Sequence, residues 1–182
     1  MEKIAVFLDY ANINAAFQEA GNRPEYDALL HYVSEGRFLL DAYAFVPIDP
    51  RNPHGRDRDI ESLWQHGYLV STKTGTIAGD SYKCDLDIEI TLALMETAET
   101  ARPDIIVLLS GDKDFVPVIL ALRKRGIRVE VGAFAGINAA REVMLKASGF
   151  IELEQFLLEQ DRDSSPETAG EIVLAEAGDE PD

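Results

Sequence analysis

The sequence has little of what would indicate a disulfide-bonded, zinc-binding or membrane protein. Its one cysteine, Cys84, cannot form an internal disulfide, and its three histidines (His31, His54 and His66) lack a spacing suited to zinc. No apolar run reaches the length of a membrane span, and the short run near the N-terminus ends in an acid without a cleavage-type site. We therefore expect a cytoplasmic protein with no membrane partner.

Basic residues are also scarce. The chain holds 17 Lys and Arg against 33 Asp and Glu, a net charge of −16 over 182 residues. Residues 161–182 carry eight acids and one base, which leaves −9 on residues 1–160. We predict one domain at 1–160 and an acidic, disordered tail at 161–182, because the tail has few large apolar residues. A solubilising tail is expected, with docking to a protein partner or shielding of a cationic groove as alternatives.

What the sequence does have is a regular alternation of apolar runs with segments of helical periodicity. Strands are predicted at 4–9, 42–47, 68–71, 105–110 and 128–134, and helices at 26–36, 57–67, 85–99, 115–126, 137–149 and 154–160. The segment at 85–99 alternates like a strand at first, but Ile88, Leu92 and Met95 fit one helical face. Strands separated by helices of this length predict an α/β domain whose mainly parallel sheet is covered on both faces.

Acidic residues stand beside several of these apolar elements. Asp9 ends the first strand, Asp112 and Asp114 follow the fourth in SGDKDF, and Asp85 and Asp87 open the ambiguous helix. Ligands of open parallel sheets bind at the carboxyl ends of the strands, so these acids are expected to converge there. Close carboxylates repel one another, and Mg²⁺ and Mn²⁺ prefer oxygen ligands. The pattern predicts a divalent metal site, although capping of the helix is an equal alternative for Asp85.

Three segments in this order resemble the NYN domain family of PIN-like nucleases, and within it the bacterial LabA-type proteins. They are VFLDYANIN (6–14), KCDLDIEITLALME (83–96) and VLLSGDKDFVPVILALRKRGIRVEVGAF (107–134). The resemblance covers roughly residues 3–155, and SGDKDF followed by helix, glycine and strand is its most specific part. It implies a PIN-like three-layer α/β/α fold with a mainly parallel central sheet, and a metal-dependent ribonuclease activity.

Carried over residue by residue, the resemblance implies a catalytic site that binds Mg²⁺ or Mn²⁺. Its metal ligands are Asp9, Asp87, Asp112 and Asp114. Asn12 matches the polar position after the first acid, where it would position water or sugar. Lys83 and Ser110 match a basic and a small polar position, and both are expected to contact substrate. Ala93 and Gly149 stand where many relatives have acids, which leaves a weakened or regulatory site open.

A nuclease must also hold a polyanion, and few segments of this chain are basic. The loop RNPHGRDR is predicted to bind single-stranded RNA through Arg51, Arg56 and Arg58. A second basic cluster ends a helix, where it suits the helix dipole; its members are Arg123, Lys124, Arg125 and Arg128. Trp64 is spaced like helix core, so we do not expect it to stack on bases.

Two other functions remain open. A non-catalytic regulator could have the same fold and act through a protein or RNA partner, and a homodimer is compatible with either function. A phosphatase of the haloacid dehalogenase type would also place an aspartate after a first strand, but its chemistry needs a second acid two residues later. Ala11 occupies that position, which disfavours the phosphatase.

Overall fold

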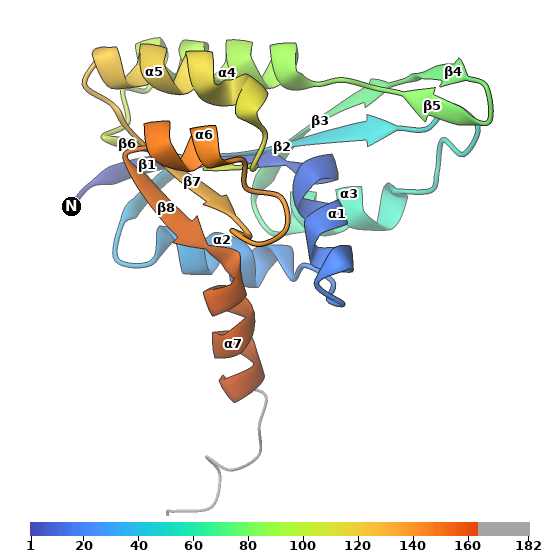
Figure 1. Cartoon of the computed structure of the whole chain (residues 1–182), viewed down its shortest axis with the longest axis horizontal. Helices are drawn as coiled ribbons and strands as arrows, with labels where there is room; N and C mark the ends of the chain where they lie inside the picture. Colours follow the sequence, from blue (N-terminus) through green and yellow to red (C-terminus); the bar gives the residue numbers. More distant parts are fainter. Residues whose placement is uncertain (164–182) are drawn as a thin grey trace, which may run out of the picture.

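A six-stranded parallel sheet forms the centre of the domain (Figure 1). The computed structural model describes residues 1–163, so the predicted tail lies outside the described residues except for its first three. The strand order is β3-β2-β1-β6-β7-β8. The bounds are β1 (Lys3–Asp9), β2 (Phe38–Ile48), β3 (Tyr68–Thr74), β6 (Ile105–Leu109), β7 (Arg128–Ala133) and β8 (Gly149–Glu152). Two short strands, β4 (Thr76–Ala78) and β5 (Ser81–Lys83), form a separate antiparallel hairpin.

Helices cover both faces of the sheet and complete a three-layer α/β/α fold (Figure 1). One layer contains α1 (Tyr10–Glu19), α2 (Tyr26–Ser34), α3 (Asp57–Gln65) and the packed start of α7 (Leu153–Asp163). The other layer contains α4 (Asp87–Thr100), α5 (Val116–Lys124) and α6 (Arg141–Lys146), with the 3₁₀ turn η1 (Lys113–Phe115) before α5. The predicted fold class is therefore confirmed.

The central strands are apolar along their whole length because both of their faces are buried. In β6 (IIVLL), Ile105, Val107 and Leu109 pack in one layer, and Ile106 and Leu108 pack in the other. Strand β1 divides its side chains in the same way between the two layers. The sheet is thus a rigid support, and the residues that follow its strands project from one well-defined edge. Among residues 1–163, no helix is long and apolar enough to span a membrane.

Several local predictions differ from the structure. Helix α1 and the β4–β5 hairpin were not predicted, and the helix expected at 137–149 is confined to Arg141–Lys146. The segment before α6 forms a turn instead, in which the backbone N–H groups of Ile137, Asn138 and Ala139 all donate to the carbonyl oxygen of Phe134. Trp64 was expected in the core but is 68% exposed, because Leu63 is the residue that α3 buries.

Helix α4 packs through a different face from the one predicted. Ile88 and Leu92 are 72% and 64% exposed, whereas Ile90 and Leu94 are fully buried. Both pairs have the spacing of one helical face, so the sequence offers two apolar stripes. Packing against the sheet and α5 selects the stripe that contains Ile90 and Leu94.

These two stripes give a matched test of the fold. Leu94→Ala is expected to lower the free energy of unfolding by about 2–5 kcal/mol, because it removes a buried side chain and leaves a cavity. Leu92→Ala on the same helix should change it by less than about 0.5 kcal/mol, since that side chain is largely exposed. Urea denaturation of the two variants measures both values. Equal destabilisation by both substitutions would contradict this orientation of α4.

Candidate metal centre

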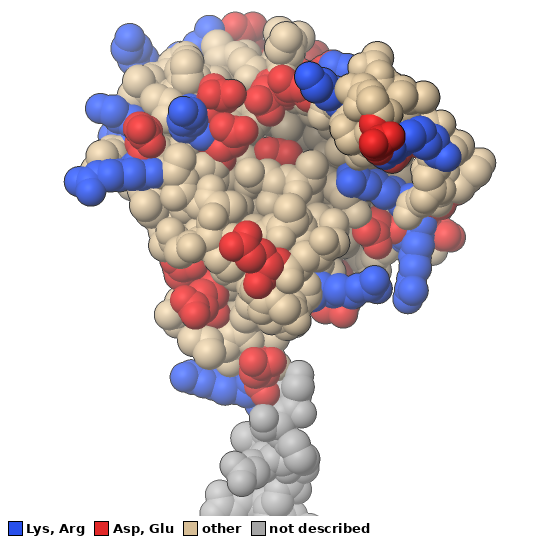
Figure 2. Space-filling view, turned by 45° about the vertical axis from the view of Figure 1, so that its right-hand side comes forward, with Lys and Arg blue, Asp and Glu red and all other residues tan. Residues whose placement is uncertain are grey.

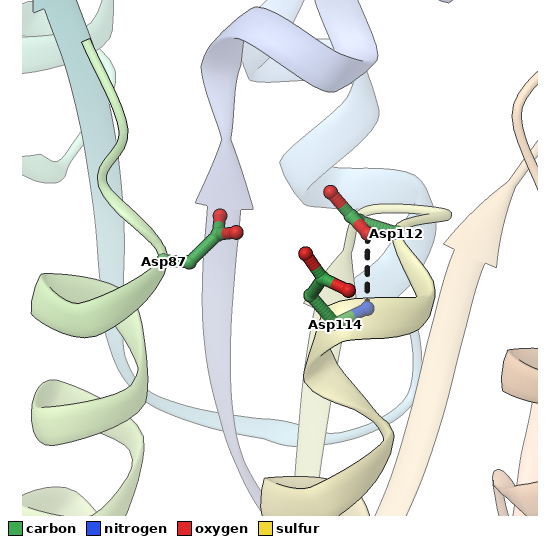
Figure 3. A group of neighbouring side chains, drawn as sticks. All are labelled: Asp87, Asp112 and Asp114. Carbon is green, nitrogen blue, oxygen red and sulfur yellow. Dashed lines mark hydrogen bonds between the residues drawn. The ribbon is translucent and has the colours of Figure 1, made fainter.

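Three of the predicted aspartates lie together beside the carboxyl end of the sheet. Asp87, Asp112 and Asp114 each offer a carboxylate oxygen, and these atoms all lie within 4.8 Å of one another. Asp87 is the first residue of α4, whereas Asp112 and Asp114 belong to the turn that links β6 to α5. Figure 3 shows the side chain of Asp87 projecting from the start of its helix toward the two aspartates of that turn. The convergence predicted for these three acids is therefore present.

Local hydrogen bonds fix the segments that carry these acids. Asp112 caps η1, because its Oδ1 accepts a hydrogen bond from the backbone N–H of Asp114 at 2.9 Å. Asp85 plays the corresponding part before α4, where its Oδ1 accepts from the backbone N–H of Asp87 at 2.8 Å. This contact agrees with the capping alternative for Asp85. In each case the residue that donates its backbone N–H, Asp87 or Asp114, contributes its own carboxylate to the group of three.

The fourth predicted ligand, Asp9, lies beside this group and is not one of its three members. Strand pairing places Leu8 opposite Leu109, so the residues that follow them, Asp9 and Ser110, are neighbours. The Ser110 hydroxyl donates to Asp9 Oδ2 at 2.8 Å. Ser110 is fully buried, so its hydroxyl orients Asp9 and has no surface to present to substrate. The predicted substrate contact of Ser110 therefore lacks structural support.

Burial and mutual repulsion raise the pKa values of two of the acids. Burial raises the pKa of Asp9 from 3.8 to about 6, the hydrogen bond from Ser110 opposes this rise, and Asp112 adds to it. Burial also raises the pKa of Asp87 to about 7, and further increases come from Asp85, Asp112, Asp9 and Asp114. Asp9 thus lies within the electrostatic field of the group of three. Negative charge at this edge is costly in the absence of a cation.

The donor set fits a small divalent cation. Mg²⁺ binds oxygen ligands at about 2.0–2.1 Å, so oxygens on opposite sides of one ion are about 4.2 Å apart. The three carboxylate oxygens span at most 4.8 Å, so a small rotation of these side chains brings all three to one ion. A set of carboxylates without nitrogen or sulfur ligands suits Mg²⁺ or Mn²⁺ better than zinc or copper. Asp87, Asp112 and Asp114 would hold the ion, with Asp9 next to them.

A second polar network supports the turn that carries Asp112. The Asn12 Oδ1 accepts hydrogen bonds from the backbone N–H of Gly111 at 2.9 Å and from Asn138 Nδ2 at 2.7 Å. A side-chain carbon at Gly111 would lie 2.1 Å from the carbonyl oxygen of Asn138, so only glycine fits at this position. The carbonyl group of Asn12 is therefore occupied by internal contacts. Sequence reasoning missed Asn138, because residues 137–149 read as one helix.

A lysine does hold the start of α4, but it is Lys73 and not the predicted Lys83. The Lys73 Nζ lies 2.6 Å from Glu89 Oε1 and donates to the carbonyl oxygen of Asp85 at 2.8 Å. Lys83 is exposed on β5 and makes no ion pair with another residue of 1–163. Its predicted contact with substrate stays a prediction. The sequence offers little indication of this role, because Lys73 precedes α4 by more than ten residues.

Two of the three loop arginines predicted to bind RNA are engaged in internal contacts. Arg51 pairs with Asp49 at 2.6 Å, and it donates to the carbonyl oxygen of Asp80 in the β4–β5 turn. Arg56 donates to the carbonyl oxygen of Pro47 at 3.0 Å and stacks over the ring of Tyr10. Arg58 is exposed and makes no ion pair within residues 1–163. Of the three, Arg58 is the most accessible to a ligand.

Basic side chains flank a gathering of acidic side chains on one face of the molecule (Figure 2). Figure 2 shows acidic side chains gathered in the upper half of the visible face, with lysines and arginines on both sides of them. The second basic cluster of the sequence lies elsewhere, at the end of α5 and the start of β7, which are at the amino ends of the strands. There Arg123 donates to the carbonyl oxygen of Lys146 at 2.6 Å, and Arg125 pairs with Glu99 at 3.0 Å. These contacts support a structural role for that cluster.

The two positions where acids were expected lie away from the aspartates. Ala93 is six residues into α4 from Asp87, which corresponds to about 9 Å along the helix axis. Gly149 begins β8 and pairs with Glu130 near the amino end of β7, whereas the aspartates follow the carboxyl ends of their strands. An acid at either position would be too far along its element to join the group of three. Neither departure removes a ligand from the site.

Comparisons with known proteins agree with this architecture. The sequence matches the NYN domain family over residues 3–154. It is 29% identical over 186 aligned positions to the low amplitude and bright protein LabA of Synechococcus elongatus, with 91% of each chain covered. A crystal structure of a protein of unknown function from Vibrio parahaemolyticus superposes with a TM-score of 0.73 and 25% identity. That match covers 85% of this chain and 94% of the Vibrio chain.

The raised pKa values predict how stability depends on pH without metal. A carboxyl group whose pKa is raised from 3.8 to about 7, as in Asp87, binds its proton more tightly in the folded than in the unfolded protein. Its contribution is therefore fully present below pH 4 and is lost as the pH rises to 7. In EDTA, the Asp87→Asn variant should lose less stability than the wild type between pH 4 and pH 8. Urea denaturation across this range measures the difference.

The control for this experiment is Glu2→Gln, which removes the same charge at an exposed position that makes no ion pair within residues 1–163. It should retain the pH dependence of the wild type. If Asp87→Asn and the wild type lost stability equally over this range, the assigned repulsion at the site would be wrong.

Proposed function

The chain belongs to the NYN domain family, and we propose that it hydrolyses phosphodiester bonds of single-stranded RNA in a reaction that depends on Mg²⁺ or Mn²⁺. Domains of this family are typically nucleases that use divalent metals. The observation that carries the proposal is the group of carboxylate oxygens from Asp87, Asp112 and Asp114, which lie within 4.8 Å of one another. The adjacent Asp9 adds a fourth acid, as the site predicted from the sequence requires.

Each acid has a proposed part in the reaction. A divalent ion at this site supplies Lewis-acid stabilisation of phosphate oxygens and lowers the pKa of water. Asp87, Asp112 and Asp114 ligate the ion, and Asp9 completes the set directly or through water. The buried Ser110 hydroxyl holds Asp9 in one orientation. Asn12 acts mainly by fixing the turn that carries Asp112, through its contacts with Gly111 and Asn138.

The proposed RNA contacts come from basic residues around the group of three aspartates. Lys83 on the β4–β5 hairpin and Arg58 at the start of α3 are exposed, and each can reach phosphate oxygens of a bound strand. Arg51 and Arg56 contribute by fixing their loop against the hairpin and against Tyr10. We further propose that residues 1–160 form the catalytic domain and that 161–182 form an acidic tail outside it.

A second candidate is a non-catalytic regulatory protein that binds RNA or a protein partner through the same fold. It is favoured by the internal contacts of Arg51 and Arg56, which reduce the number of basic side chains that remain to bind a polyanion. The two functions differ in one measurable property, because only the nuclease turns over RNA.

The nuclease is tested with Asp112→Asn. With Mn²⁺, the wild type should cleave a single-stranded RNA, and the variant should cleave it more slowly by more than roughly a hundredfold. Mutation of a residue that only supports a metal ligand typically costs about 10–100-fold in activity, and this variant loses a ligand itself. Mn²⁺ should also raise the melting temperature of the wild type, because it binds only the folded protein. That increase should be smaller in the variant. Gel-based cleavage assays and thermal melts provide the two measurements.

Glu2→Gln is again the matched control, and it should cleave RNA like the wild type. A wild type that binds RNA but releases no fragments with either Mg²⁺ or Mn²⁺ would favour the regulatory protein. A wild type whose melting temperature does not respond to either ion would remove the basis of the metal site.

A further inference from the structure

A hollow that is separate from the group of three aspartates lies beside the start of α1. Its volume is about 490 Å³, a size typical of sites for small organic ligands. It lies between α1, the segment before α2, and the start of α3. Tyr10, Asn14 and Gln18 form its α1 wall, one helical turn apart from each other. Because Tyr10 directly follows Asp9, the hollow and the metal centre share a boundary of one residue.

The hollow is basic although the protein as a whole is strongly acidic. Three arginines line it, Arg23, Arg56 and Arg58, against two acids, Glu25 and Asp59. Arg23 and Arg58 are exposed, and neither makes a hydrogen bond or an ion pair that would occupy its guanidinium group within residues 1–163. These two guanidinium groups are therefore available to a ligand that carries negative charge.

Other wall residues are fixed in place by contacts with one another. The Tyr10 hydroxyl donates to Asp59, which satisfies part of that acid's charge. The guanidinium carbon of Arg56 lies 4.8 Å from the centre of the Tyr10 ring, and its Nη1 donates to Pro47. A wall that is rigid before binding loses little conformational entropy when a ligand enters.

An unsatisfied buried hydroxyl also belongs to this hollow. Tyr26 lines it and is only 5% exposed, and its hydroxyl lies beside that of Tyr10 without a hydrogen bond of good geometry. Buried polar groups are nearly always hydrogen-bonded, so such a group is a sign that a partner is missing. A ligand in the hollow would supply an acceptor or donor for it after a small shift of the wall.

We propose that this hollow binds one nucleotide of an RNA strand, with a phosphate group on Arg23 and Arg58. Arginine suits phosphate because its planar group donates two parallel hydrogen bonds. Asn14, Gln18 and the Tyr26 hydroxyl supply hydrogen bonds to the sugar or base. A strand that passes the aspartates at Asp9 reaches Tyr10 at once, so one strand occupies both sites. The choice of RNA as ligand rests on the proposed function, whereas the phosphate site rests on the hollow itself.

The test measures RNA binding without cleavage. The full-length protein is titrated in EDTA into a fluorescently labelled single-stranded RNA of about ten nucleotides, at several salt concentrations. Arg23→Ala combined with Arg58→Ala should weaken binding by roughly tenfold or more at low salt. It should also reduce the slope of log affinity against log salt by roughly 1.4, because two phosphate contacts to a single strand are lost.

The matched control is Lys124→Ala combined with Arg125→Ala, which removes the same charge at the amino edge of the sheet. It should change the affinity less than roughly twofold. Tyr26→Phe is a third variant, expected to weaken binding severalfold with little change in the melting temperature, because the hydroxyl makes no well-formed internal hydrogen bond. That combination separates a ligand contact from a purely structural role.

The outcomes separate this inference from the proposed function. If the wild type binds RNA through Arg23 and Arg58 but never cleaves it, the hollow is supported and the nuclease is not. If it cleaves RNA while the double arginine variant binds like the wild type, the hollow is refuted and the nuclease stands. A wild type that binds no RNA would also overturn the inference.

Discussion

Repulsion between carboxylates at one edge of a rigid sheet is the constraint on which the rest of this structure depends. Parallel pairing of β1 with β6 brings Asp9 next to the turn that carries Asp112 and Asp114, and α4 presents Asp87 to the same place. The hydrogen bonds of Asp85 and Asp112 to the following backbone keep the segments that carry these charges close together. The protein therefore holds a site whose carboxyl pKa values are raised and whose charge is best neutralised by a cation.

The contacts around the aspartates hold the segments that carry them in place. Lys73 ties the start of α4 to the end of β3, Ser110 orients Asp9, and Asn12 joins Gly111 to Asn138. Hydrogen bonds from the Ser110 hydroxyl and from the Asn12 backbone lower the pKa of Asp9, but they do not prevent its net rise. The common effect of these contacts is to keep the acidic segments in one geometry, which is how a metal site is prepared before the ion binds. The basic hollow beside Tyr10 is the place where we propose that the negative charge of a substrate strand is held.

The sequence was sufficient for the parts that depend on local pattern. Buried strands are almost wholly apolar, and the acids that follow them stand out, so five of the six strands and the group of three aspartates were predictable, whereas the short, half-buried β8 was not. The buried face of α4 was not, because Ile88 and Leu92 form as good a stripe as Ile90 and Leu94 until the sheet is present. The carbonyl group of Asp80 that Arg51 contacts and the partners of Lys73 lie on other segments of the chain. Strands β4 and β5 have only three residues each, which is too short to show a strand pattern. Such features come from tertiary packing.

The central claim is that the aspartates bind a divalent cation. The most direct measurement is anomalous X-ray diffraction from crystals of the protein soaked in Mn²⁺, which locates the ion without any assumption about catalysis. The account predicts an anomalous peak bounded by Asp87, Asp112 and Asp114, with ligand distances close to those of octahedral oxygen sites. A structure at high Mn²⁺ with no peak between these three side chains would contradict it.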